Sequence, residues 1–252
     1  MAPSDAARAQ RDELFPGRVS TLAFTDPELV EHFEDLAFDE VLRDSRLAPR
    51  TRLMVQLAAL VACQGAAEYR AMLGAALAVG VTPVEVKEIV YQCVPYVGMA
   101  KVLDALHVTN EVLVEHGVEL PLPGQSTTTP HDRATKGLAV QREIVGADVV
   151  ESLYTNAPAD QVHVQRLLSA NCFGDHYTRT GLDLPTRELL TFAMLVALGG
   201  CDPQVRGHVA ANGNVGNGRE VLVDVVTQLV PYIGYPRALN GLRAVDDVAP
   251  AG

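Results

Sequence analysis

Two stretches of this chain decide its fold: GVTPVEVKEIVYQCVPYVGMAKVLDAL (residues 80–106) and GNGREVLVDVVTQLVPYIGYPRALNGL (residues 216–242). Both carry the pattern Gln-x-Val-Pro-Tyr-x-Gly at the same position. The match continues upstream, where LAPRTRLMVQLAALVACQG (residues 47–65) parallels LDLPTRELLTFAMLVALGG (residues 182–200) and FDEVLRDSRL (residues 38–47) parallels FGDHYTRTGL (residues 173–182). Because the spacing of the blocks is nearly constant, the sequence indicates one supersecondary unit that has been duplicated.

Each unit is predicted to be helical. Apolar residues within 52–73 are spread around a helical wheel, and the run is too long for a strand. Thr82 with Glu85 three residues later is typical of a capped helix start. Gly98 and Gly234 follow a Pro-Tyr pair, which predicts a kink or an end there. The expected fold is therefore all-α, with two tandem copies of a multi-helix unit.

A segment between the copies lacks apolar periodicity. It reads GVELPLPGQSTTTPHDR (residues 117–133) and is rich in Pro, Gly, Ser and Thr, which predicts an extended linker. We place the boundary there, with a first repeat over residues 1–124 and a second over residues 125–252. The two repeats need not fold independently, since each can bury its apolar face against the other.

Composition excludes several functional classes. The formal net charge of -11 repels phosphate backbones, so we expect no nucleic-acid partner. The longest apolar stretch, Leu189 to Leu198, is too short to span a bilayer, and the N-terminal residues lack an apolar signal core. The default expectation is a cytoplasmic protein with reduced thiols. The four cysteines show no zinc-ligand spacing, and no phosphate or dinucleotide fingerprint is present, so neither a metal nor a cofactor is predicted.

The second copy carries a recognisable set of motifs. They are Leu182 to Leu189 with Arg187-Glu188, then Cys201, His208, Val215-Gly216, and Tyr232-Ile-Gly-Tyr-Pro236, preceded by Phe173-Gly174…Tyr177-x-Arg179-x-Gly181-Leu182. In these residues the chain resembles the carboxymuconolactone decarboxylase family, which includes alkylhydroperoxidase-like proteins. The resemblance implies an all-helical fold, a lyase-type or peroxide-reducing activity, and assembly into a ring.

The first copy keeps the helical pattern of the family but lacks the candidate catalytic residues. Met72 stands where the second copy has His208, and Leu53 stands where it has Glu188. We therefore expect the active site in the second copy, with the first copy as a scaffold that completes the pocket wall.

His208 is the strongest catalytic candidate, because an imidazole near neutral pH can give or take a proton at carbon. Glu188 is a candidate to orient it. Cys201 is expected at the start of the helix that carries His208, where the helix dipole would lower a thiol pKa.

Several residues are candidates to bind substrate. Arg179 and Arg206 offer guanidinium groups that can grip a carboxylate. Their candidate companions, from the segment before the main helices and from the His208 helix, are His176, Tyr177 and Asn212.

The leading functional hypothesis is a cofactor-free decarboxylase or isomerase acting on a small carboxylated lactone or keto acid. One alternative is a thiol-dependent alkylhydroperoxide reductase that uses Cys201, although its helix lacks the Cys-x-x-Cys pair of the redox members. Another is a binding protein without catalysis. The resemblance also implies a homo-oligomer, for which a trimer is favoured because a tandem chain replaces two single-unit subunits.

Overall fold

The structure is a computed structural model that describes residues 3–18 and 20–251, and within those ranges it contains helices and no strand. The first unit comprises α1 (Asp5–Leu14), α2 (Leu22–Thr25), α3 (Pro27–Asp35), the π-helical segment η1 (Leu36–Glu40), α4 (Val41–Arg43), α5 (Pro49–Cys63), α6 (Ala66–Ala78), α7 (Pro83–Val97) and α8 (Met99–Glu115). The second comprises α9 (Arg133–Val145), α10 (Ala147–Thr155), α11 (Val162–Leu167), the π-helical segment η2 (Leu168–Tyr177), α12 (Leu184–Leu198), α13 (Asp202–Asn214), α14 (Arg219–Ile233) and α15 (Tyr235–Val248).

The duplication predicted from the sequence is confirmed by the element order. Helices α5 to α8 recur as α12 to α15, and a π-helical segment precedes each set. The local signals also act as predicted. Thr82 and Glu85 form a reciprocal capping box at the start of α7, while Gly98 and Gly234 end α7 and α14 with positive φ angles. The all-α tandem fold is thus encoded largely by local sequence.

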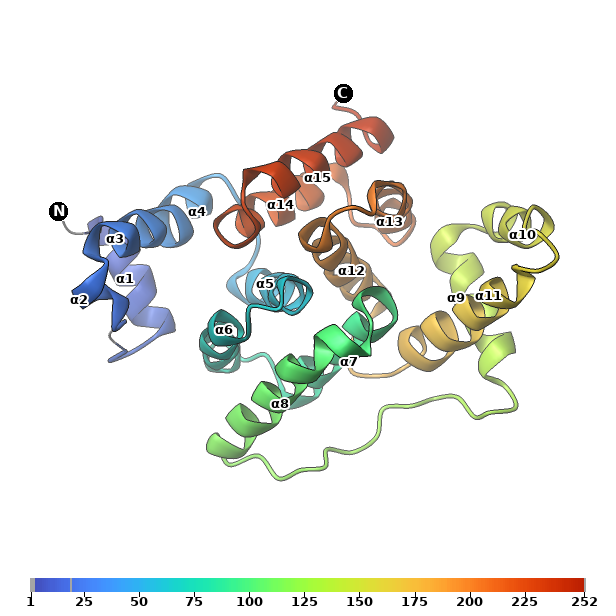
Figure 1. The fold of residues 1–252 in the computed structure, drawn as a ribbon, viewed down its shortest axis with the longest axis horizontal. Coiled ribbons are helices and arrows are strands. Elements are labelled where there is room, and N and C mark those ends of the chain that lie inside the picture. The colour runs from blue at the N-terminus through green and yellow to red at the C-terminus, as the bar shows by residue number, and fades with distance from the viewer. Residues whose placement is uncertain (1–2, 19, 252) are drawn as a thin grey trace.

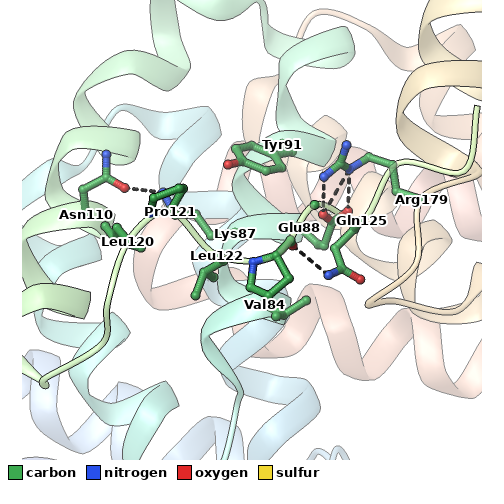
Figure 2. A pocket seen from close by; sticks show the side chains of 12 residues that line it. Val84, Lys87, Glu88, Tyr91, Asn110, Leu120, Pro121, Leu122, Gln125 and Arg179 are labelled. Carbon is green, nitrogen blue, oxygen red and sulfur yellow. Dashed lines mark hydrogen bonds and ion pairs between the residues drawn. The ribbon is translucent and has the colours of Figure 1, made fainter. Parts of the chain in front are cut away.

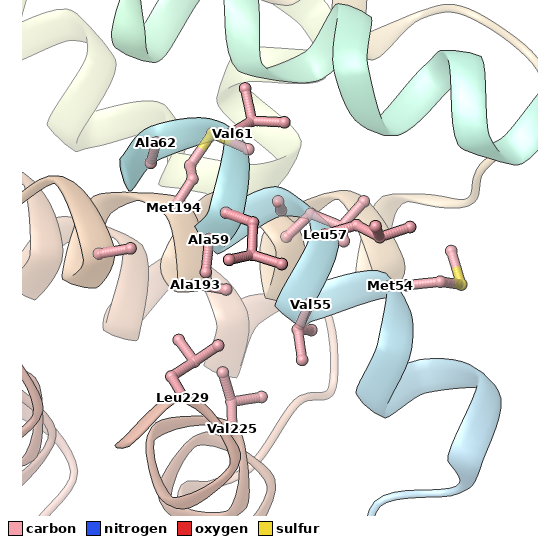
Figure 3. Close-up of a cluster of buried hydrophobic side chains, with 14 of the residues drawn as sticks. Met54, Val55, Leu57, Ala59, Val61, Ala62, Ala193, Met194, Val225 and Leu229 are labelled. Atoms are coloured by element: carbon pink, nitrogen blue, oxygen red, sulfur yellow. The ribbon is translucent and has the colours of Figure 1, made fainter. Parts of the chain in front are cut away.

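The two units share one hydrophobic core. Helices α5 and α12 lie side by side at the centre of the molecule (Figure 1). Their Ala- and Val-rich faces interlock with α14, as the contacts around Val55, Ala193 and Leu229 show (Figure 3). Helix α7 of the first unit packs on α12 of the second, and α14 of the second packs on α5 of the first. Each unit therefore completes the core of the other.

The linker between the units is anchored along its path. It runs as an extended segment from α8 to α9 along one side of the molecule (Figure 1). The backbone N–H of Thr180 donates to the carbonyl of Gln125 at 3.0 Å, and the hydroxyl of Thr127 donates to the carbonyl of Thr178 at 2.7 Å. The repeat boundary predicted at residues 124–125 falls within this segment and stays a prediction.

Helix α9 crosses η2 so closely that only glycine fits at the crossing. A Cβ atom on Gly137 would lie 2.0 Å from the carbonyl oxygen of Ser169, and one on Gly174 would lie 2.2 Å from that of Arg133. Both obstacles are backbone atoms, which cannot rotate away. We therefore expect Gly137→Ala to lower the free energy of unfolding by about 3 kcal/mol, as measured by urea denaturation.

Gly74→Ala in α6 is the matched control, because nothing lies within 4 Å of its added Cβ. This substitution should raise stability by about 0.5–1 kcal/mol, since alanine favours a helix interior. If both variants change stability in the same direction, the close crossing of α9 and η2 is wrong.

Candidate active site

The site is centred on His208, whose side chain is 14% exposed in α13. Its Nδ1 lies 2.8 Å from Oε2 of Glu188, a carboxylate on α12 that is completely buried. The imidazole also meets the ring of Tyr96 edge to face, with centroids 5.4 Å apart. Tyr96 comes from α7 of the first unit, so elements of both units position the histidine.

This geometry sets the tautomer of His208. The Glu188 carboxylate can only accept hydrogen bonds, so Nδ1 must be the donor and carry a hydrogen. Nε2 of the neutral ring is then left with its lone pair, and in the protonated ring Nε2 carries the proton that can be transferred. The carboxylate on Nδ1 also fixes the orientation of the ring, as in other carboxylate–histidine pairs. Such an arrangement can support general acid–base chemistry.

Glu188 is itself held in place by Tyr177. The phenol donates to Oε1 of Glu188 at 2.6 Å, and its oxygen also lies 2.8 Å from Thr191 and 2.9 Å from Tyr96. Burial and the nearby Glu188 raise the pKa of Tyr177 well above its ordinary value, so the phenol remains a donor. Tyr177 is 2% exposed and orients the carboxylate of Glu188, and its role as a substrate ligand stays a prediction.

The polar network continues across the interface between the units. The amide of Gln92 on α7 donates to Thr191 at 3.3 Å and accepts from Arg187 at 2.9 Å. Sequence reasoning missed Thr191, Gln92 and Tyr96 as members of the site. The recurrence of Gln-x-Val-Pro-Tyr in both copies was the available signal, since it placed a glutamine and a tyrosine on each interface helix.

The network ends in a buried ion cluster. Arg187 is completely buried and donates to Glu88 on α7 at 2.9 Å, and Arg179 pairs with the same carboxylate at 2.9 Å. Glu88 precedes Tyr96 by eight residues, which is about 12 Å along the helix axis. The ion pair of Arg179 with Glu88 therefore lies at a second polar location beside α7, displaced from the imidazole of His208.

Comparison with known proteins agrees with this architecture. Residues 27–111 and 163–247 each match the Carboxymuconolactone decarboxylase family. The chain belongs to the carboxymuconolactone decarboxylase family. It is also similar to the 4-carboxymuconolactone decarboxylase of Acinetobacter baylyi, with 29% identity over 116 residues, which cover 46% of this chain and 86% of that protein. Most of the relative's length thus corresponds to less than half of this two-unit chain.

Two candidates for substrate binding, Arg206 and Asn212, contact other residues of the protein. Arg206 forms a half-exposed ion pair with Asp247 at 2.8 Å, and its counterpart Arg70 pairs with glutamates of α8. Asn212 is completely buried and donates to the carbonyls of Glu188 at 3.1 Å and His208 at 2.7 Å. Both side chains are engaged by other parts of the protein in this structure, and their role as substrate ligands stays a prediction.

His176 lies beside the ion cluster. Its Nδ1 is buried and has no hydrogen-bond partner within the described part of the chain. Burial, followed by the positive charge of Arg179, lowers the pKa of His176, so the ring is neutral at pH 7. Its role as a substrate ligand stays a prediction.

The thiol of Cys201 departs from the sequence-based expectation. Cys201 immediately precedes α13 as predicted, but burial and the neighbouring Asp202 raise its pKa rather than lowering it. Burial also raises the pKa of Cys63, of Cys93 and, to about 12, of Cys172. All four cysteines are free. These thiols lack the activation that a peroxide-reducing cysteine needs.

We expect Cys201 in the folded protein to react with iodoacetamide at pH 7.5 about fivefold or more slowly than in the urea-unfolded chain. Only the thiolate attacks the reagent, and a raised pKa reduces the thiolate fraction at a given pH. Peptide mass spectrometry over time measures the rate at each cysteine. Equal or faster reaction in the folded state would contradict the raised pKa and restore the peroxidase alternative.

Neither a metal site nor a membrane-spanning helix is found among the described residues. No group of three or more His, Cys, Asp or Glu side chains among them is arranged to hold a metal ion. None of the helices in residues 3–18 and 20–251 has the length and apolar character needed to cross a bilayer.

Proposed function

We propose that this protein is a lyase that decarboxylates a small carboxylated lactone or keto acid of the 4-carboxymuconolactone type, with His208 as the proton-transfer residue and no cofactor. The observation that carries the proposal is the contact of 2.8 Å between Nδ1 of His208 and the fully buried carboxylate of Glu188. The family membership and the decarboxylase relative support the same reaction class.

The proposed step conserves atoms and charge. The bond between the substrate carbon and its carboxylate breaks, CO2 leaves, and the electron pair is held as an enolate by the adjacent carbonyl. Protonated His208 then delivers the hydrogen on Nε2 to that carbon, so that one proton replaces one CO2. Glu188 stabilises the imidazolium before the transfer, and solvent returns the proton afterwards.

The direct test is incubation of the purified protein with 4-carboxymuconolactone. We expect loss of the substrate absorbance with release of one CO2 for each molecule consumed. A folded protein that releases no CO2 from this substrate, or from a panel of related carboxylated lactones and keto acids, would contradict the proposal.

We further propose that the protein assembles as a homo-oligomer, with a trimer favoured. Exposed apolar side chains occupy matching positions at the starts of the last helix of each unit: Met99 and Leu103 on α8, Tyr235 and Leu239 on α15. Their recurrence in both units indicates a self-association surface that the duplication copied.

Light scattering after gel filtration is expected to give a mass of three times 27.0 kDa. The double variant Leu103→Glu/Leu239→Glu should shift the mass towards the monomer, because two charges would have to be buried at the contact. Leu153→Glu on α10, another exposed leucine outside this surface, is the control and should keep the oligomer. A wild-type monomer would contradict the proposal.

A further inference from the structure

A cavity lies beneath the linker, and its lining does not include His208. It has a volume of about 340 Å³ and is enclosed by α7, α8, the linker around Leu120 to Gln125, and Arg179 (Figure 2). Tyr91 forms one wall, and the apolar side chains of Val84 and Leu122 face the space. The cavity is large enough for a small organic molecule.

Lys87 is a buried cation in the wall of this cavity, and no carboxylate of the described residues forms an ion pair with it. The residue is 8% exposed, and its ammonium donates a hydrogen bond to the amide oxygen of Asn110, a neutral acceptor. Burial lowers the pKa of Lys87, which reflects the cost of holding a charge there. A buried charge without a partner is costly, so its presence points to a ligand that supplies the partner.

The opposite side of the cavity is also positive. Glu88 is the one carboxylate in the described lining, and it is already shared by Arg179 and Arg187 at 2.9 Å each. Two guanidinium groups against one carboxylate leave an excess positive charge, and Arg179 remains 18% exposed. The guanidinium of Arg179 lies 5.2 Å from the ring centre of Tyr91, and the ammonium of Lys87 lies 6.0 Å from it. The cavity therefore offers two cations flanking an aromatic face, in a chain whose net charge is -11.

We propose that this cavity is a binding site for a small, flat organic carboxylate, whose anionic group lies between Lys87 and Arg179 and whose apolar body packs on Tyr91. Cations on two sides favour an anion, and the aromatic and aliphatic walls favour an unsaturated hydrocarbon body. The site goes beyond the proposed decarboxylation, because its lining includes neither His208 nor Glu188.

Calorimetric titration with 2-naphthoate tests the proposal, with uncharged 2-naphthamide as the matched probe. We expect the carboxylate to bind to wild-type protein and the amide to bind at least about tenfold more weakly, since it lacks the charge that pairs with Lys87. Lys87→Met should weaken naphthoate binding about tenfold or more. Lys101→Met removes a lysine from α8 outside the cavity lining and should leave the affinity unchanged.

His208→Ala separates this site from the proposed active site. Naphthoate affinity should be unchanged in that variant even if all decarboxylation is lost. Loss of naphthoate binding in His208→Ala, with binding retained in Lys87→Met, would mean that the probe occupies the active site and would overturn the proposal. Absence of binding to wild-type protein by both 2-naphthoate and benzoate at millimolar concentration would overturn it as well.

The thermal midpoint without ligand gives an independent readout. If Lys87 serves a ligand, Lys87→Met should raise the midpoint by about 2–4 °C, because it removes the cost of a buried unpaired charge. If the lysine is structural through Asn110, the midpoint should fall, which would contradict the proposal. Should Lys87→Met fail to fold, Tyr91→Leu tests the same cavity and should weaken naphthoate binding about fivefold.

Discussion

His208→Ala is expected to lower kcat for decarboxylation by about 1,000-fold while leaving the protein folded. The imidazole is the group at the site whose geometry allows proton delivery to carbon, and general acid–base residues contribute about 100- to 10,000-fold. Because its side chain is only 14% exposed, truncation leaves a small cavity beside Glu188, so the folded state of the variant must be verified. Substrate depletion and CO2 release, followed side by side with circular dichroism, measure the effect.

Met72→Leu provides the matched control, because Met72 occupies the position of His208 in the first unit and its exchange for leucine conserves volume. This variant should keep full activity. If His208→Ala retains more than about a tenth of the wild-type kcat, proton transfer by His208 is excluded. If wild-type protein binds substrates without turnover and His208→Ala binds them equally well, the non-catalytic alternative is favoured instead.

The sequence predicts the fold better than the site, because helices are encoded by neighbouring residues whereas the site is formed by residues far apart in the sequence. Helix starts and ends follow from local signals such as Thr82 with Glu85, and the repeat reveals the tandem order. The partners of the site residues lie far away in sequence: Arg179 is 91 residues from Glu88, and Gln92 is 99 residues from Thr191. Pairing them requires the knowledge that α7 of one unit packs on α12 of the other, which no local pattern contains.

Burial changes how two of the candidate side chains behave in the fold. Asn212 and Cys201 have residue types suited to ligand binding or catalysis. In the fold, however, neighbouring groups already bind the amide of Asn212 and disfavour the thiolate form of Cys201. The side-chain amide of Asn212 donates hydrogen bonds to two backbone carbonyls, and burial raises the pKa of the Cys201 thiol. The chemical type of a residue can be read from the sequence, whereas its exposure depends on how the units assemble.

The interface between α5 of the first unit and α14 of the second holds an incomplete counterpart of the same network. Arg52 and Gln56 occupy the positions of Arg187 and Thr191, and Gln228 occupies that of Gln92. Within the described part of the chain, each of these three residues has a buried polar atom without a hydrogen-bond partner: Nη2 of Arg52, Oε1 of Gln56 and Oε1 of Gln228. Among their counterparts Arg187, Thr191 and Gln92, one such atom is found, Nε of Arg187. The two related interfaces thus differ in how completely their buried polar groups are paired.

Glu88→Gln is expected to lower the free energy of unfolding by about 3–5 kcal/mol, because it removes the carboxylate that balances two arginines. Arg187 is completely buried and cannot turn to solvent, so its charge would remain uncompensated inside the interface of the two units. Urea denaturation followed by circular dichroism measures the loss.

Asp224→Asn is the control that decides between a local and a general effect of removing a carboxylate. Asp224 occupies the position of Glu88 in the second unit, yet it accepts a bond from the backbone N–H of Arg46 at 2.9 Å in an exposed setting. Its replacement should change stability by about 0.5 kcal/mol or less. Equal effects of the two substitutions would contradict the buried cluster. A large loss confined to Glu88→Gln would show that the charge cluster joins the two units, since Glu88 belongs to the first and both arginines belong to the second.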